Sequence, residues 1–185
     1  MVGVKFTAVN LDAWYADFKR FGIDLTSVVM ARALQGIKKL FQEDEKQLFG
    51  SEGAKGKAGK WPKLSDAYKA WKQKYYPGKT IMIRTERLMK SLTGENSESV
   101  QTLIRDNPKT LTLRLGTLVS YAEYHQRGIK SKRGILVRKT LDPTNRQLQL
   151  WIKEIQKEVV KESKKRMIAF KQSNEPPRAM FDRIK

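Results

Sequence analysis

The single histidine, His125, has the side chain best suited to acid–base chemistry, and Glu123 and Tyr124 lie beside it. The chain has no cysteine to act as a nucleophile, and its serines lack the spacing of a nucleophile elbow. A metal site needs several ligands, and carboxylates are scarce in this half of the chain. We therefore predict a structural His125, hydrogen-bonded near a helix end, and no catalytic, metal or cofactor site.

The glycine-rich segment 50–60, GSEGAKGKAGK, invites comparison with a phosphate-binding loop. A Walker A loop carries Ser or Thr directly after its Gly-Lys pair, and neither Gly-Lys pair of this segment is followed by one. The composition instead predicts a flexible loop. Its lysines, Lys55, Lys57 and Lys60, are candidate contacts for DNA or for an acidic partner.

Aromatic and lysine side chains alternate just after this loop. Rings beside cations are what a single-stranded nucleic acid needs. Three of the rings share one face of a predicted helix, however, which favours a place in the core or at an interface, with the lysines on the solvated face. The aromatic residues are Trp61, Tyr68, Trp71, Tyr75 and Tyr76.

The net charge of +19 is concentrated in the later part of the chain. Residues 1–50 hold 7 of the 38 lysines and arginines and 6 of the 19 acids, which leaves 31 bases and 13 acids for the rest. Such a field favours nucleic acid or an acidic protein partner, and the sequence leaves both open. A second basic cluster is formed by Lys130, Lys132 and Arg133.

Hydrophobic periodicity predicts an α+β protein with a small antiparallel β-sheet packed against two longer α-helices. In the last helix Leu148, Ile152, Ile155 and Val159 share one face, with Trp151 beside them. The expected elements are a strand within 1–10, a helix over 24–50, a helix over 65–75, a short helix over 85–92 capped by Thr85, a hairpin over 99–117, a short helix over 120–127, a strand over 135–137 and a long helix over 143–170.

Composition limits the size of the core. Charged residues make up 31% of the chain against a norm of about 25%, so long exposed helices or arms are expected. We divide the chain into an N-terminal arm (1–24), one domain (25–170) and a basic C-terminal tail (171–185). No apolar run reaches the roughly 20 residues that cross a bilayer, and the N-terminus lacks the pattern of a secretory signal, so we expect a cytoplasmic protein without membrane contact.

Two segments resemble, in order and spacing, the signature of phage virion morphogenesis proteins, also called tail-completion proteins. The first is GKWPKLSDAYKAWKQKYYPGKTIMIRTERLMKSLTG. Its matching residues are Trp61, Leu64, Ser65, Tyr68, Lys72, Ile81, Thr85, Leu88, Ser91 and Leu92. The second is LGTLVSYAEYHQRG. Its matching residues are Gly116, Thr117, Tyr121, Ala122, His125, Gln126 and Gly128.

The resemblance covers about residues 25–160. It departs from the family at Glu86, where glycine is usual, and before the last helix, where a proline and a phenylalanine are missing. Within it we expect Tyr121, Tyr124 and His125 to face inward, Gly128 to end their helix, and Gly116 to let a strand pass close to that helix.

The resemblance implies a structural virion protein of a tailed bacteriophage, with no enzymatic activity and no cofactor. Such a subunit forms a homo-oligomeric ring, expected to be a hexamer, that caps the tail tube and joins it to the head. Its partners would be neck, portal-connector or tail-tube proteins, with non-specific contact to packaged DNA. We expect assembly contacts from 50–60, from 144–170 and from both terminal arms. A basic nucleic-acid-binding module is the alternative.

Overall fold

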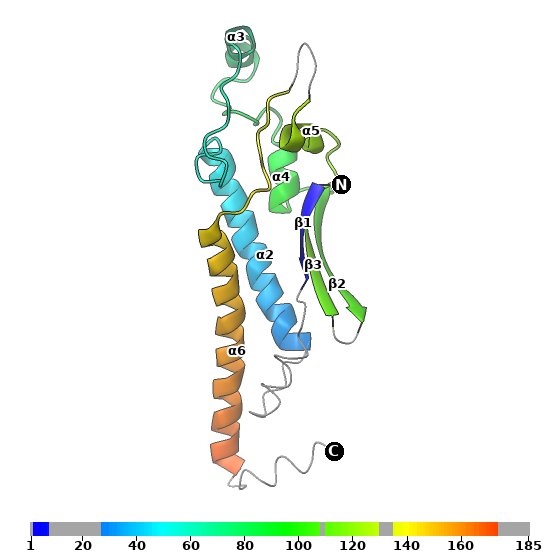
Figure 1. Ribbon diagram of the computed structural model, residues 1–185, viewed down its shortest axis with the longest axis vertical. Coiled ribbons are helices and arrows are strands. Elements are labelled where there is room, and N and C mark those ends of the chain that lie inside the picture. Colours follow the sequence, from blue (N-terminus) through cyan, green and yellow to red (C-terminus); the bar gives the residue numbers. More distant parts are fainter. Residues whose placement is uncertain (1, 8–26, 108–109, 130–134, 174–185) are drawn as a thin grey trace.

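The computed structural model describes residues 2–7, 27–107, 110–129 and 135–173, which form an elongated α+β structure (Figure 1). The α+β fold class expected from the sequence is confirmed. In chain order the elements are β1 (Val2–Thr7), α2 (Ser27–Gly50), α3 (Asp66–Tyr75), α4 (Arg87–Thr93), β2 (Ser99–Asn107), β3 (Thr110–Thr117), α5 (Ala122–Arg127) and α6 (Asn145–Ser173).

The sheet is antiparallel, with β3 in the centre and β1 and β2 at its edges. The period of two predicted for this hairpin places Leu113 and Leu115 in the core, where both are almost completely buried. Gly116 is buried too and pairs with Gly3 of β1. Residues 108 and 109, between the two strands of the predicted hairpin, lie outside the described residues.

Helix α2 lies between α6 on one side and α4 with the sheet on the other (Figure 1). Its apolar residues occur at helical spacing, and Ile37 and Phe41 are each only 2% exposed. Gly36 permits close approach of α6, since a Cβ at this position would lie 2.6 Å from the side chain of Glu154. The expected pair of long helices is present, but α6 packs mainly on α2 rather than on the sheet.

Helix α6 buries only part of the predicted stripe, and Ile155 of that stripe packs against the core. Trp151 and Val159 are buried, whereas Ile152 is 53% exposed and Leu148 36% exposed. A helix that packs on one neighbouring helix buries a narrow stripe, so residues at the edge of the apolar face stay in solvent. Arg32 of α2 borders the stripe through its ion pairs with Glu158 and Glu162.

Residues 135–137 do not form the predicted strand. The backbone N–H of Ile129 donates to the carbonyl of Ile135, and the N–H of Arg138 donates to the carbonyl of His125, at 3.0 and 2.7 Å. These bonds join the segment to the end of α5, so its polar backbone groups are satisfied there rather than in a sheet.

Segment 50–60, for which a flexible loop is predicted, follows a series of hydrogen-bonded turns. The N–H of Gly53 donates to the carbonyl of Leu48 at 2.9 Å, and the N–H of Trp61 donates to Glu52 at 2.8 Å. Gly53 has φ +89°, and a Cβ there would lie 2.6 Å from the Trp61 ring, so glycine meets both demands. The segment is thereby fitted over a buried tryptophan.

The terminal segments are described only in part. Residues 2–7 of the predicted N-terminal arm form an edge strand of the sheet, while 8–26 and 174–185 lie outside the described residues. None of the described helices has the length and hydropathy required to cross a membrane.

Candidate functional site

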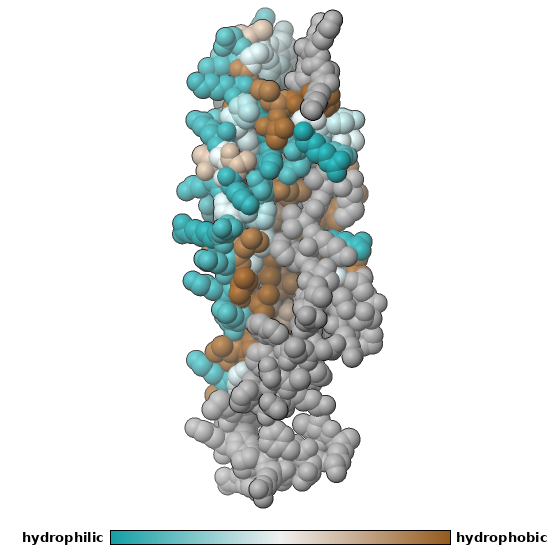
Figure 2. Space-filling model, viewed as in Figure 1, coloured by the Kyte–Doolittle hydropathy of each residue, from teal (hydrophilic) through white to brown (hydrophobic). Residues whose placement is uncertain are grey.

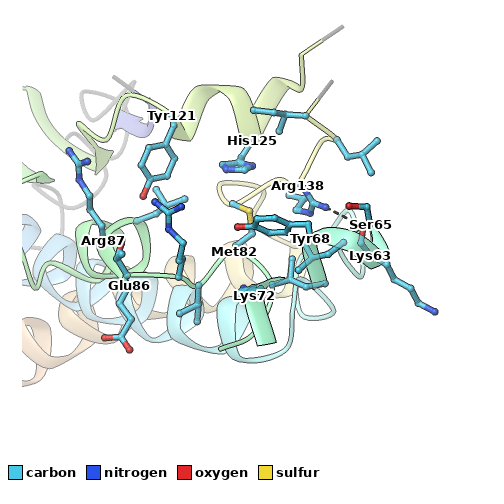
Figure 3. A pocket seen from close by; sticks show the side chains of 18 residues that line it. Lys63, Ser65, Tyr68, Lys72, Met82, Glu86, Arg87, Tyr121, His125 and Arg138 are labelled. Carbon is cyan, nitrogen blue, oxygen red and sulfur yellow. Dashed lines mark hydrogen bonds between the residues drawn. The ribbon is translucent and has the colours of Figure 1, made fainter. Parts of the chain in front are cut away.

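A cavity of about 610 Å³ opens between α3, the loop before α4, helix α5 and residues 135–138 (Figure 3). Nine of the residues that match the resemblance line it, so both segments of the resemblance meet at one place. These residues are Leu64, Ser65, Tyr68, Lys72, Ile81, Thr85, Leu88, Tyr121 and His125.

Gln126 fastens one wall of this cavity to helix α5. Its Oε1 accepts hydrogen bonds from the backbone N–H groups of Thr140 and Leu141, at 2.9 and 3.2 Å. Its Nε2 donates to the carbonyl of Leu141 at 2.9 Å. The side chain of Gln126 thus satisfies backbone groups that a neighbouring strand would bond in a sheet, and it holds this segment in place.

Gly128 ends α5 and turns the chain toward the same wall. Its φ of +76° is unfavourable for residues with a side chain, and a Cβ would lie 2.9 Å from Cγ2 of Val137. The helix end predicted at this glycine is confirmed.

Trp61 lies beneath the entry to α3 and is 3% exposed. Its Nε1–H donates to the carbonyl of Lys139 at 3.0 Å, and its ring meets the Phe49 ring edge-on, with centroids 5.3 Å apart. Leu88 is likewise buried, at 2% exposure. Both side chains belong to the main buried core of the described chain.

The sequence did not predict the contact between the buried hydroxyl groups of Ser91 and Thr117. Ser91 of α4 and Thr117 of β3 lie 2.6 Å apart, oxygen to oxygen, and both are buried. Thr117 also accepts from the N–H of Val119 at 3.0 Å. The pair fixes α4 on the sheet, and the signal for it was the match of both residues to the resemblance.

Helix α3 does not pack its aromatic face into the core of the chain, which was one of the two places expected for it; the other, an interface, stays a prediction. The helix begins after the N-cap Ser65, Tyr68 and Trp71 are 41% and 40% exposed, and its buried residue is Lys72. The Nζ of Lys72 donates to the carbonyl of Thr80, which holds the chain after the helix against it. Lys72 follows Tyr68 by four residues, so it shares the aromatic face from which it reaches inward.

The start of α4 also differs from prediction. Thr85 does not cap the helix; the N-cap is Glu86, in the left-handed conformation, with φ +62° and ψ −1° and no side-chain cap bond. Glycine tolerates this conformation best, and other residues adopt it at a cost. The Glu86 carboxylate pairs with Lys79 and, at 3.1 Å, with Lys90, and these bonds hold its pKa below the usual value.

His125 projects toward the cavity beside Arg138, and Tyr121 stands edge-on to it, with ring centroids 6.0 Å apart (Figure 3). Its Nδ1 is buried and makes no hydrogen bond with any described residue, so the hydrogen bond predicted for this side chain is not found. Burial, and then the charge of Arg138, lower its pKa. A neutral imidazole at pH 7 follows, which fits a wall residue. Tyr124, predicted to face inward, is 49% exposed.

Arg138 is the cation at the centre of the site, and sequence reasoning missed it. Its Nε and Nη2 donate to the carbonyl of Pro62, at 3.1 and 3.0 Å, so it clamps the entry to α3. Burial lowers its pKa, with the Tyr68 hydroxyl acting in the opposite direction. A charged residue directly after the apolar run 135–137 was the signal that could have identified it.

The cavity is electropositive. Five of its lining residues are Lys or Arg and one is a carboxylate, Glu86, whose side chain points away from the other labelled residues (Figure 3). Arg87 pairs with Glu98. The remaining four cations form no ion pair with a described residue; they are Lys63, Lys72, Arg84 and Arg138.

The other predicted contacts are placed only in part. Lys55, Lys57 and Lys60 are exposed on the turns of 50–60. Lys130, Lys132 and Arg133 lie outside the described residues. Within the described part of the chain, no three His, Asp or Glu side chains group as a metal site would require. What the site offers is therefore a basic cavity edged by aromatic rings.

Comparison with models of known protein families, with curated proteins and with solved structures finds no match to this chain.

Proposed function

We propose that this chain is a structural subunit of a tailed-phage virion, a tail-completion or neck protein that joins head and tail as part of a homo-oligomeric ring. The backbone of Glu86 carries the proposal. The family that this segment resembles usually has glycine here, and the chain adopts at this residue the left-handed conformation that glycine favours. The backbone conformation of Glu86 thus agrees with the glycine usual in that family, although the residue type differs, and this agreement supports the resemblance.

The roles of the matching residues give further support. Trp61 and Gln126 bond backbone carbonyls and N–H groups, Gly128 turns the chain, and Ser91 joins a helix to the sheet. Each of these contacts builds the subunit. None sets a nucleophile beside a base, which is the arrangement that covalent catalysis needs.

Helix α6 offers a surface for contact with a neighbouring copy. Ile152 is 53% exposed and lies one turn after the partly exposed Leu148. Figure 2 shows hydrophilic residues along one edge of the molecule and an apolar band beside them. A closed ring needs two different, complementary patches on each subunit, and this pair of side chains is suited to one of them.

The direct test is deletion of the gene from the phage that encodes it. We expect heads and tails to accumulate unjoined, and a plasmid copy of the chain to restore infectious particles. Complete, infectious virions without this chain would refute the proposal.

Ring formation is tested on the purified chain by native mass spectrometry and negative-stain electron microscopy. Ile152→Asp should lower the ring population because it places a charge in an apolar contact. Gln149→Asp adds the same charge at an exposed polar position of α6 and should leave the ring intact. Equal loss in both variants would show that charge alone, and not this patch, matters.

A further inference from the structure

Helix α3 carries three aromatic rings in a row on its exposed side, and we name Tyr68, Trp71 and Tyr75 the aromatic ladder. The Tyr68 and Trp71 rings are stacked, with centroids 5.4 Å apart and planes inclined by 22°. The Trp71 and Tyr75 rings are also 5.4 Å apart. The three residues are 40–56% exposed, so much of their surface lies in solvent.

Exposing three neighbouring rings to water costs free energy, so the arrangement calls for an explanation. Aromatic side chains carry a large apolar surface, and folded chains usually bury it. Here the same helix buries Lys72 and leaves the rings outside. The ladder is therefore a surface for a ligand that stacks on rings.

The surroundings of the ladder fix the charge of that ligand. From residue 60 to residue 90 the chain has nine lysines and arginines and two acids, Asp66 and Glu86. Lys74 lies over the Tyr75 ring at 5.4 Å from its centroid, and Arg84 lies 5.9 Å from the centroid of the neighbouring Tyr76 ring. A polyanion is complementary to this surface.

The ladder and the basic cavity are continuous, because Tyr68 belongs to both. A ligand that stacks on the rings thus places its next charged group near Arg138 and Lys72, neither of which is paired with a described carboxylate. Planar groups alternating with phosphates are the structure of a nucleic acid. In a duplex the bases already stack on each other, so only an unpaired strand can offer its bases to the rings.

We propose that the aromatic ladder and the adjoining basic cavity bind single-stranded nucleic acid, with bases on Tyr68, Trp71 and Tyr75 and phosphates toward the cavity cations. This activity goes beyond a structural role in head–tail joining and does not depend on it.

The test is fluorescence anisotropy of the full-length chain with a fluorescein-labelled 20-residue oligo(dT) and, in parallel, a 20-base-pair duplex. Trp71→Ala and Tyr75→Ala should each weaken oligo(dT) binding by about 5- to 150-fold, since base stacking on a ring contributes about 1–3 kcal/mol. Tyr124→Ala removes an exposed tyrosine outside the ladder and should leave binding unchanged. All three substitutions preserve the net charge.

Two further variants separate stacking from folding and from charge. Trp71→Phe keeps an aromatic plane and should restore most of the affinity. Arg84→Gln should reduce the slope of log K against log salt by about 0.7, the value for one phosphate contact on a single strand. Thermal unfolding of each variant checks that the fold is intact.

Three outcomes would overturn the inference. One is the absence of oligo(dT) binding at 50 mM salt. Another is equal binding by the wild type and both ladder variants, which would show that the oligonucleotide binds through non-specific charge attraction alone. The third is self-association that depends on Trp71 together with oligo(dT) binding that does not, which would make the ladder a contact between copies of this chain. None of these outcomes bears on the gene-deletion test of head–tail joining.

Discussion

Glu45 of helix α2 is a carboxylate in the core, and replacing it with glutamine should stabilise the protein at neutral pH. The residue is 5% exposed, and its Oε2 makes no hydrogen bond with a described residue. The adjoining cavity of about 20 Å³ holds one water at most and cannot hydrate a charge fully. Burial, and then the nearby charge of Asp44, raise the pKa of Glu45 well above its usual value.

The direction of the pH effect follows from that raised pKa. Below the ordinary glutamate value of 4.5 the carboxyl is neutral in both the folded and the unfolded chain, so burial of the charge costs nothing there. As pH rises, the unfolded chain ionises first and the folded state loses stability until the folded pKa is passed. Leaving a buried polar group without a partner costs about 1–3 kcal/mol, and a charged one costs more.

We therefore expect Glu45→Gln to raise the free energy of unfolding by about 2 kcal/mol at pH 8 and by almost nothing at pH 4.5. In a chain of this size that difference is roughly 4–8 °C in Tm. Thermal unfolding of wild type and variant across this pH range measures it. Glu43→Gln makes the same charge change at an exposed position and should show no such pH dependence. A gain of equal size at both pH values would refute the reasoning.

Three other substitutions test residues that shape the walls of the cavity, and chemical denaturation measures the free energy of unfolding of each variant. Gln126→Leu should cost about 2–3 kcal/mol, because Thr140 and Leu141 lose their side-chain partner; a loss below 0.5 kcal/mol would show that water replaces it. Gly128→Ala should cost at least about 1 kcal/mol through its positive φ, and a neutral result would contradict that strain. Glu86→Gly should be more stable than Glu86→Ala by about 0.5–1 kcal/mol, since both lose the same ion pairs and only alanine is strained; the reverse order would argue against a left-handed residue 86.

Local signals in the sequence predicted most of the elements and several of their ends. Gly128 ends α5 as expected, because glycine accepts a positive φ at a helix end, and Gly94 ends α4 in the same way. The alternating leucines of β3 indicated the central hairpin. These features depend on residues close together in the chain, which a sequence displays directly.

Periodicity alone did not identify the covered face of each helix. The spacing of Tyr68, Trp71 and Tyr75 showed that they share a face, and the tertiary structure leaves that face exposed while Lys72 turns inward. In α6 the same spacing pointed to Ile152, which is exposed. A helical pattern defines which residues lie together but not which neighbour packs on them.

The basic cavity is likewise a product of the tertiary structure. Arg138 meets the carbonyl of Pro62, 76 residues earlier in the chain, and Gln126 bonds Leu141, which lies after the strand predicted over 135–137. By itself the sequence determined the helices, the hairpin and an excess of positive charge, because these follow from local propensity and residue type. Only the fold decided where that charge is concentrated and which rings remain in solvent, because both depend on contacts between residues distant along the chain.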